Sequence, residues 1–310
     1  MHALAIHGGA GAMPRNGAAD ERAKEYRASL ALALDAGFAI LDRGGASLDA
    51  VTTCVRMLED DPLFNAGRGA ALTCDGWAEL DAAVMTGAKQ KAGAVAAVRH
   101  VKNPIELARR VMEKSRHVLL VGAGAEEFAL EEGFALTPNL YFRTDERRRQ
   151  LEQEKLGHSV SDLMPRPQGT VGAVALDGRG DLAAATSTGG MTNKRQGRVG
   201  DSPIIGAGTY AKNGVCAVSA TGDGEYFIRA VAAYHICAAV EYRGLSLADA
   251  AREAVHVNIG ALGGSGGVIA VDAHGALVME FSTEGMFRGA RDCTGRREIS
   301  MYRDADNAAK

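Results

Sequence analysis

Apolar side chains recur at helical spacing in two stretches near the start of the chain, residues 19–43 and 47–60. The Gly44-Gly45 pair is expected to end the first helix, and Ser47 is expected to cap the second. Further helices are predicted from Asn103-Pro104 onward and over residues 125–132, 225–242 and 246–258.

Short runs of β-type residues fall between these helices. Residues 3–6 form an apolar run typical of an inner strand, and the glycine-rich residues 7–12 are expected to form a flexible loop. Two pairs of runs predict hairpins, 80–85 with 92–98 and 268–271 with 277–281. Other strands are predicted over residues 117–121, 171–176, 182–187 and 215–220.

Strands cluster, helices cluster and strands then return, which differs from the regular alternation of parallel α/β proteins. This order predicts the α+β class, with helices packed on largely antiparallel sheets in a layered α-β-β-α sandwich. We expect one compact domain over all 310 residues. The charged run 145–155 predicts an exposed helix, within a segment at residues 137–168 that is expected to contain a mobile linker.

Composition narrows the classes of partner. The net charge is −3, and no long apolar run indicates a membrane span, so neither nucleic acid nor a membrane is an expected partner. The first residues lack the basic and apolar parts of a secretory signal, and a cytoplasmic location is expected. The 5 cysteines are widely spaced without a C-x-x-C pair, which predicts free thiols and argues against zinc. Small zwitterionic molecules are the expected partners.

Thr170 is a candidate nucleophile because it follows Gly169 at the start of a predicted strand. If the chain is cut between these two residues, the threonine gains a free α-amine beside its hydroxyl, and the pair can act as base and nucleophile. The reference pKa of such an amine is roughly 7.7–8.0, so a useful fraction is unprotonated at neutral pH. Taken alone, a threonine in this position is more often simply the first residue of a strand.

Two further threonines stand at the ends of predicted strands. If the strand ending at Thr188 pairs antiparallel with the strand that starts at Thr170, the two hydroxyls lie close together. Thr221 precedes Gly222-Asp223-Gly224 and a predicted helix, where unpaired N–H groups can stabilise an oxyanion. An ordinary turn from strand to helix is the alternative for that segment.

Arg198 and Asp201 lie three residues apart in a glycine-flanked loop. The guanidinium offers a bidentate fork for a carboxylate, and the aspartate offers an anion for an ammonium group. Together they could hold both charges of an α-amino acid. The alternative is a solvent-exposed ion pair, which contributes under about 1 kcal/mol.

These residues belong to blocks that resemble a known family in sequence and in order. Over nearly its whole length, the chain resembles the plant-type (class 2, also called type III) L-asparaginase/isoaspartyl peptidases of the N-terminal nucleophile hydrolase superfamily. The blocks are His7-Gly8-Gly9-Ala10-Gly11, Phe64-Asn65-Ala66-Gly67, Gly169-Thr170-Val171-Gly172-Ala173-Val174-Ala175, Thr188-Gly189-Gly190-Met191, Gly197-Arg198-Val199-Gly200-Asp201-Ser202-Pro203 and Thr221-Gly222-Asp223-Gly224-Glu225.

The resemblance implies an autoproteolytically activated amidohydrolase. A precursor would cleave itself before Thr170 into an α subunit, residues 1–169, and a β subunit, residues 170–310, which remain together and pair as an (αβ)2 heterotetramer. The implied substrates are L-asparagine, hydrolysed to aspartate and ammonia, and β-aspartyl (isoaspartyl) dipeptides. No organic cofactor is implied.

The resemblance also implies roles for individual residues. Thr170 would be the nucleophile, Thr188 would assist it, and Thr221 with the Gly222 N–H would form the oxyanion hole. Arg198 would hold the substrate α-carboxylate and Asp201 its α-amine, with backbone of Gly222 and Gly224 completing the pocket. Asn65 would support the site from the α subunit. A structural sodium ion would bind backbone carbonyls, here those of Leu58, Glu59, Asp61, Phe64, Ala66 and Arg68.

Two features depart from the family pattern, and both bear on substrate preference. Asp223 adds a negative charge between Gly222 and Gly224, and Arg195 makes the loop before Arg198 rather basic.

Other functions compete with this interpretation. The segment Val121–Glu127 follows a strand like a dinucleotide-binding turn but lacks the third glycine, and Ser265 lacks the pattern of a nucleophile elbow. Within the family, a glycosylasparaginase-like amidase and a threonine endopeptidase are alternatives. A secreted glycosylasparaginase would carry a signal peptide and paired cysteines, and the endopeptidase a longer insertion. An unprocessed, inactive binding scaffold of the same fold is the alternative outside enzymes.

Overall fold

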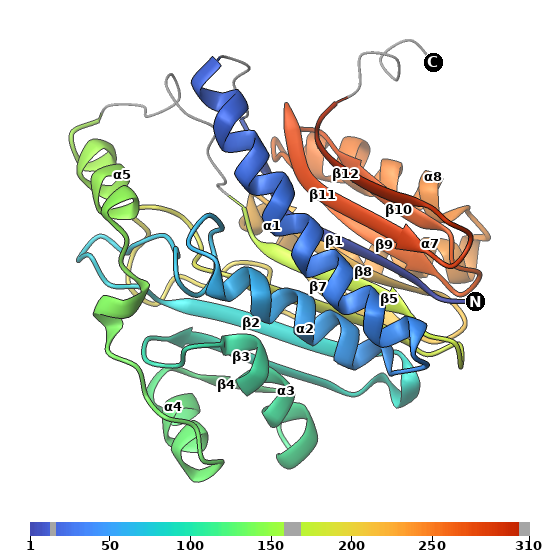
Figure 1. Cartoon of the computed structure of the whole chain (residues 1–310), viewed down its shortest axis with the longest axis horizontal. Helices are drawn as coiled ribbons and strands as arrows, with labels where there is room; N and C mark the ends of the chain where they lie inside the picture. The colour runs from blue at the N-terminus through green and yellow to red at the C-terminus, as the bar shows by residue number, and fades with distance from the viewer. Residues whose placement is uncertain (13–16, 158–168, 304–310) are drawn as a thin grey trace.

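Two β-sheets form the centre of the molecule in the computed structural model, which describes residues 1–12, 17–157 and 169–303 (Figure 1). The larger sheet has the strand order β12 (Arg297–Tyr302), β11 (Gly285–Asp292), β1 (Ala3–Gly11), β5 (Val171–Leu176), β6 (Leu182–Thr188), β2 (Leu80–Thr86), β3 (Ala92–Val98), β4 (Leu119–Val121). The smaller sheet has the order β10 (Leu277–Phe281), β9 (Gly266–Asp272), β8 (Cys216–Gly222), β7 (Thr209–Lys212). Within these sheets neighbouring strands are antiparallel except β3 and β4, which are parallel.

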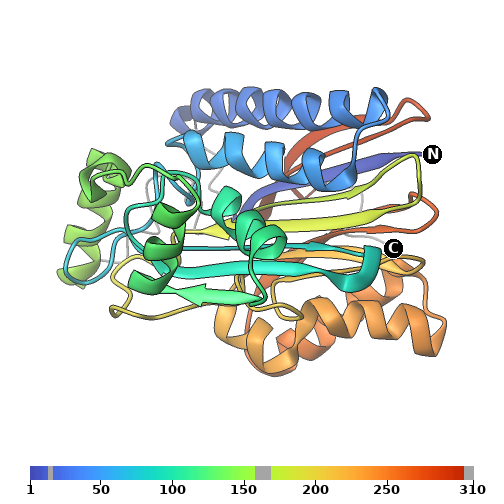
Figure 2. The same ribbon diagram turned by 90° about the horizontal axis from the view of Figure 1, so that it is seen from below.

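Helices cover the outer faces of both sheets (Figure 2). On the larger sheet lie α1 (Gly17–Asp42), α2 (Ser47–Asp60) and α3 (Pro104–Lys114), and on the smaller sheet α6 (Gly224–Ala230), α7 (Ala232–Arg243) and α8 (Leu247–Arg252). At the end of the larger sheet lie α4 (Gly122–Glu131), η2 (Asn139–Phe142) and α5 (Asp145–Lys155), while η1 (Ala88–Gln90) joins β2 to β3 and η4 (Glu253–Ile259) continues α8 as a π-helix. The predicted α+β class with largely antiparallel sheets is confirmed.

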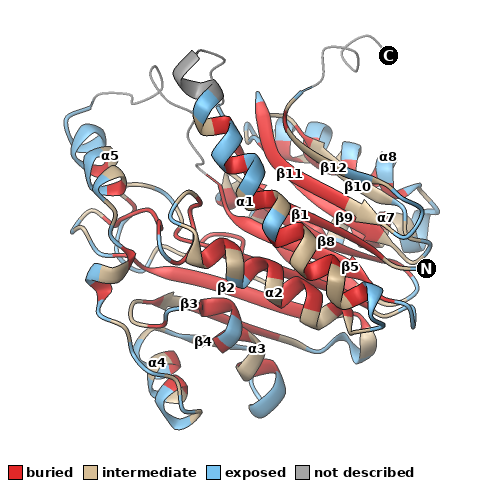
Figure 3. Ribbon diagram, in the orientation of Figure 1, coloured by how far each residue is buried: buried red, intermediate tan, exposed pale blue. Residues whose placement is uncertain are grey.

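The two faces of β1 belong to two different cores. Leu4 and Ile6 pack with the helices on the outer face, whereas Ala3 and Ala5 pack between the two sheets. This alternation follows from the two-residue period of a strand. Figure 3 shows that β1, β5 and β8 are buried along most of their length.

The N-terminal strand is longer than predicted. Residues 7–11, predicted as part of a flexible loop, continue β1 with an irregularity between His7 and Gly9. Glycine is required here for packing, because a Cβ on Gly9 would lie 2.6 Å from the Cα of Gly169, and the φ angle of Gly9 is +110°. The block is therefore a closely packed strand beside the predicted cleavage site.

Several predictions about helices and strands are corrected. Ala46, not Ser47, is the N-cap of α2, and the Ser47 N–H instead donates to Asp177 Oδ2 at 2.9 Å. The helix predicted over 225–242 is broken into α6 and α7 at Val231, which has a left-handed backbone with φ of 48°. The hairpin predicted as the last is followed by β11 and β12, which return the chain to the larger sheet beside β1.

The charged run at residues 145–155 forms α5 as predicted, but one side of this helix is buried. Arg147 and Leu151 are 5% and 6% exposed, and Phe142 just before the helix is fully buried. The predicted linker segment is therefore packed against the domain through Phe142 and one side of α5, and residues 158–168 lie outside the described residues. None of the helices in the described ranges combines the length and apolar character that a membrane span requires.

Candidate active site

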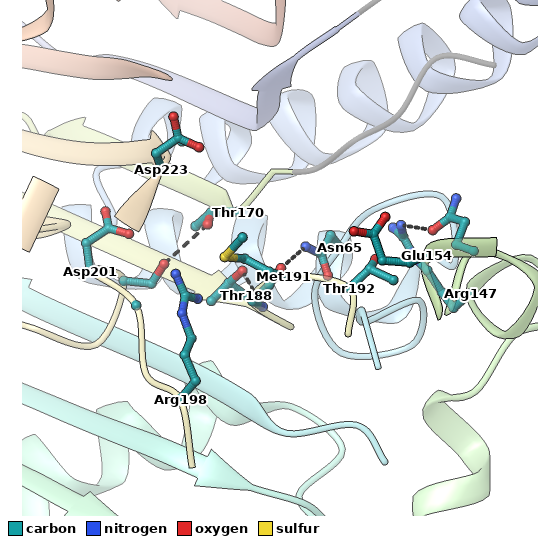
Figure 4. Close-up of a pocket in the computed structure, with 15 residues that line it drawn as sticks. Asn65, Arg147, Glu154, Thr170, Thr188, Met191, Thr192, Arg198, Asp201 and Asp223 are labelled. Atoms are coloured by element: carbon teal, nitrogen blue, oxygen red, sulfur yellow. Dashed lines mark hydrogen bonds between the residues drawn. The ribbon is translucent and has the colours of Figure 1, made fainter. Parts of the chain in front are cut away.

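A pocket of about 880 Å³, measured to its open mouth, lies where β5 begins and where β6 and β8 end. Because the three strands are antiparallel neighbours or face each other across the sheets, Thr170, Thr188 and Gly222 meet at one edge (Figure 4). The sequence blocks that are far apart in the chain thus contribute to a single site.

Thr170 lies in the pocket wall and is 6% exposed. Its Oγ1 is 3.3 Å from the Ser202 hydroxyl. The pairing of Val171 with Ser187 brings Thr188 alongside Thr170, as predicted from the antiparallel register. Ser202, which the sequence analysis did not single out, is the hydroxyl in hydrogen-bonding distance of the candidate nucleophile.

Thr188 and Asn65 shape the turn that follows β6. The Thr188 hydroxyl accepts a hydrogen bond from the Gly190 N–H at 3.0 Å, and Asn65 Nδ2 donates to the Gly190 carbonyl at 2.7 Å. Asn65 Oδ1 accepts from the Ala71 N–H at 2.7 Å, which fixes the amide orientation. Asn65 therefore holds a turn of the predicted β subunit from within the predicted α subunit.

A buried chain of polar side chains runs behind Thr170. His7 Nε2 is 3.0 Å from the Ser219 hydroxyl, which is 2.7 Å from the Thr186 hydroxyl. The Thr209 hydroxyl lies 2.6 Å from Thr186 Oγ1 and 3.1 Å from the Ser202 carbonyl oxygen, and so links the two residues. Burial lowers the pKa of His7 to about 3, so this imidazole is neutral and does not supply a cation or a titrating base near pH 7.

Thr221 and Gly222 end β8 beside the pocket. Gly222 lines it, whereas Thr221 is fully buried and its Oγ1 accepts a hydrogen bond from the Ala10 N–H at 3.3 Å. Gly222 has a φ of +143°, and a Cβ there would lie 2.4 Å from the Ser265 carbonyl oxygen. Only glycine fits this backbone and this space.

Arg198 lines the pocket with its side chain 17% exposed. Its Nε and Nη2 donate to Glu225 at 2.9 and 2.7 Å, and this contact lowers the pKa of Glu225. Glu225 was missed as a site residue, although its position in the first turn of a helix is typical of an acidic side chain. Arg195 is exposed and is not among the pocket-lining residues of the described chain.

Asp201 is buried in the pocket wall, and burial raises the pKa of its carboxyl to about 6. Oδ2 receives no hydrogen bond from any polar group of the described residues. A Cβ on Gly224 or on Gly208 would lie 2.8 Å from a carboxylate oxygen of Asp201, so both glycines make room for it. The arrangement differs from the exposed ion pair considered above, since the partner of Arg198 is Glu225.

Asp223 and Ser265, which were considered separately in the sequence, contact each other. Asp223 Oδ2 accepts hydrogen bonds from the Ser265 N–H at 2.9 Å and from the Ser265 hydroxyl at 3.0 Å. The serine hydroxyl donates to a carboxylate rather than to a histidine. This geometry satisfies the turn and provides no activation of Ser265 as a nucleophile.

The far side of the pocket was missed by the sequence analysis. Arg147, Gln150 and Glu154 of α5 line it, together with Met191 and Thr192 (Figure 4). These α5 residues come from the segment that was predicted to be exposed.

The glycine-rich segment after Val121 does not form a dinucleotide loop. Gly122 and Gly124 lie inside α4, which begins directly at the end of β4. Glu126 of this helix accepts hydrogen bonds from the backbone N–H groups of Arg99 and His100. The segment is thus a packing element at the edge of the larger sheet.

The predicted ion-binding loop is tightly curled. The Glu59 carbonyl accepts a hydrogen bond from the Arg68 N–H at 2.7 Å, and a Cβ on Gly69 would lie within 2.6 Å of the carbonyl oxygens of both Pro62 and Phe64. Such a set of neutral oxygens is the donor type that a hard cation prefers. The sodium site of this loop stays a prediction.

The chain is similar to known proteins over nearly its whole length. A protein-family model described as asparaginase matches residues 1–301. The isoaspartyl peptidase of Salmonella typhimurium is 53% identical over 308 residues, which cover 97% of this chain and 98% of that protein. The isoaspartyl peptidase of Escherichia coli is 52% identical over 308 residues, covering 97% and 96%, and the isoaspartyl peptidase/L-asparaginase of Rattus norvegicus is 45% identical over 289 residues, covering 91% and 84%. The chain therefore belongs to the asparaginase family.

Proposed function

We propose that the protein hydrolyses L-asparagine to aspartate and ammonia and cleaves β-aspartyl dipeptides. The observation that carries this proposal is the pocket in which the Thr170 hydroxyl lies with an unpartnered buried carboxylate, Asp201, and a guanidinium, Arg198. A nucleophile that shares its pocket with a carboxylate and a guanidinium suits an amide substrate with α-ammonium and α-carboxylate groups. The names of the relatives in Salmonella typhimurium and Rattus norvegicus support the same substrates.

Activation begins with the Gly169–Thr170 peptide bond. The Thr170 hydroxyl attacks the Gly169 carbonyl, the amide shifts to an ester with release of the Thr170 amine, and water hydrolyses the ester. The close contact of Gly9 with Gly169 supports this step, because it holds the backbone before the scissile bond in a fixed position. The products are subunits of residues 1–169 and 170–310.

In hydrolysis, the freed amine of Thr170 accepts the proton of its own hydroxyl as Oγ1 attacks the substrate carbonyl. Thr188 polarises the hydroxyl, and the Gly222 N–H stabilises the oxyanion. The Thr221 hydroxyl, fully buried against the Ala10 N–H in the uncleaved chain, would join it after cleavage. Ammonia or the leaving amino acid departs with a proton from the amine, and water then attacks the ester to release aspartate. Ser202 joins this set as a hydrogen-bonding partner of Thr170 Oγ1, which it approaches at 3.3 Å.

The α-groups of the substrate bind at the end of the pocket formed by Asp201 and Arg198. Asp201, a buried carboxylate in the pocket wall, receives the ammonium. Because Glu225 takes Nε and Nη2 of Arg198, the substrate carboxylate would bind the remaining Nη1. Backbone of Gly222 and Gly224 completes the pocket.

Two further properties belong to the proposal. The sheets and their helical covers would form the four-layer αββα sandwich of N-terminal nucleophile hydrolases, assembled as an (αβ)2 heterotetramer. A sodium ion would bind the carbonyls of the loop at residues 58–68 and hold Asn65, which lies in that loop, in place. The 5 cysteines are free thiols, which agrees with a cytoplasmic location.

The decisive test is the intact mass of the purified protein after incubation at neutral pH, with Thr170→Ala as the comparison. We expect the unmodified protein to give two fragments, cut between Gly169 and Thr170. The variant should give a single full-length chain. Ammonia release from L-asparagine and aspartate release from a β-aspartyl dipeptide then measure the activity. A stable full-length chain without turnover would favour the unprocessed scaffold.

A further inference from the structure

The pocket extends from Asp201 to α5. Figure 4 shows Asp201, Arg198 and Asp223 toward one end, Thr170 and Thr188 near them, and Arg147, Glu154 and Thr192 at the other end. In the proposed function the aspartyl part of the substrate occupies the Asp201 end. The α5 end therefore lies on the side of the leaving group.

Arg147 at this end is a buried cation without a direct ion pair. It is 5% exposed, its Nε donates to the Gly69 carbonyl, and its Nη1 donates to Gln150 Oε1 at 2.9 Å. Both acceptors are neutral, and among the ion pairs of the described chain none includes Arg147.

The nearest acidic residue of the same helix is already engaged. Glu146 pairs with Arg22, and its other oxygen accepts from Gln150 Nε2 at 3.2 Å. Burial without a direct ion pair is unfavourable for a guanidinium, and it lowers the pKa of Arg147 more than the nearby charge of Glu146 raises it. Glu154 also faces this end, but it is exposed and solvated. An anion that enters the pocket would supply the missing charge to Arg147.

We propose that Arg147 binds the free α-carboxylate of the leaving amino acid in β-aspartyl dipeptides. This inference rests on the proposed function. A β-aspartyl dipeptide carries this carboxylate one residue beyond the scissile amide, whereas asparagine releases only ammonia and has no group there. Arg147, oriented by Gln150, thus distinguishes the two substrates by binding rather than by chemistry.

The first test needs no variant. The processed protein is assayed with three substrates: β-aspartyl-leucine, its C-terminal amide and L-asparagine. The free acid is expected to have a KM lower than that of the amide by about tenfold to a hundredfold, the ratio typical of one charge-assisted hydrogen-bonded contact. Equal KM values for acid and amide would overturn the inference.

The second test uses Arg147→Gln and Arg147→Lys, with Arg148→Gln as the matched control. Arg148 is on the same helix, its side chain is 60% exposed, and it is not a pocket-lining residue of the described chain, so its loss changes the charge of α5 equally without changing the pocket. Intact mass and melting temperature verify processing and folding of each variant.

Arg147→Gln is expected to raise KM for the free acid to that of the amide, while kinetics with the amide and asparagine change by less than about twofold. Lysine should restore part of the difference, and Arg148→Gln should keep the unmodified ratio. Equal losses on all three substrates would assign Arg147 a structural role. If the unmodified, processed protein turns over none of them, the proposed function fails and the inference fails with it; turnover without discrimination overturns the inference alone.

Discussion

Replacing Asp201 by asparagine removes one negative charge from the pocket and tests what that charge binds. The two side chains have nearly the same shape, and Gly208 and Gly224 pack directly against the carboxylate, so the variant fits without repacking. Oδ2 has no donor to lose among the described residues. We therefore expect Asp201→Asn to fold and to process normally, and to lose affinity for substrates with an α-ammonium group.

The expected loss follows from burial. Asp201 is 3% exposed, so an ammonium bound to it is shielded from water. A hydrogen bond between charged groups contributes about 1.5–3 kcal/mol, and breaking a buried ion pair costs about 3–5 kcal/mol. A loss of about 2–4 kcal/mol corresponds to a fall in kcat/KM of roughly thirtyfold to a thousandfold.

The dependence of kcat/KM on pH tests the role of Asp201 independently. Burial raises the pKa of Asp201 to about 6, so below this pH the carboxyl becomes neutral and loses its attraction for the ammonium. The Thr170 amine, with a reference pKa of roughly 7.7–8.0, must also be unprotonated. The slope of log kcat/KM against pH should therefore steepen from about one to about two below pH 6. In Asp201→Asn it should stay near one.

The assay compares L-asparagine with succinamate, which has the same amide and carboxylate but lacks the α-amine. Asp201→Asn should reduce kcat/KM for asparagine and leave that for succinamate within about threefold. A similar loss of kcat/KM on both substrates would refute the assignment of Asp201 as the ammonium site. So would a slope of log kcat/KM below pH 6 that is the same in Asp201→Asn as in the unmodified protein.

Three further changes test other parts of the site. Gly9→Ala should slow self-cleavage, measured by intact mass, because the added Cβ would lie 2.6 Å from Gly169 Cα. Gly44 also has a positive φ but has open space around it, so Gly44→Ala is the control. It should lower the free energy of unfolding by only about 1–2 kcal/mol and should process normally. Arg198→Ala should raise KM for asparagine at least tenfold while self-cleavage proceeds, and equal damage to both would indicate a structural role. Replacing sodium by choline should lower the melting temperature if the loop at 58–68 binds the ion, and a temperature independent of sodium would contradict that site.

The fold could be predicted where the local pattern and the burial agree. The hairpins β2–β3 and β9–β10 have regular runs of apolar or small residues, and both were predicted. β11 was missed because it contains Arg288, which is buried and stacks 4.9 Å from the Phe281 ring. The break at Val231 was also missed, since a β-branched residue in a left-handed conformation has no local signal.

Glycine-rich segments have two structural meanings, and this ambiguity made the prediction for residues 7–11, beside the site, wrong. A glycine-rich segment indicates either conformational freedom or a close approach of backbone, and the sequence does not distinguish the two. Residues 7–11 were predicted to be flexible, yet Gly9 is packed against Gly169. The contact depends on a segment about 160 residues away in the chain, so only the tertiary structure reveals it.

The α5 side of the pocket shows what a closer inspection of the pattern could have found. Residues 145–155 contain three consecutive arginines, and their types do not distinguish them. Leu151 is the only apolar residue of this run and so marks the buried side of the helix. Arg147 precedes it by four residues and shares its face, whereas Arg148 is turned to solvent. One leucine could thus have predicted which arginine is buried, but not that a pocket would adjoin it, because β5, β6 and β8 form the rest of that wall.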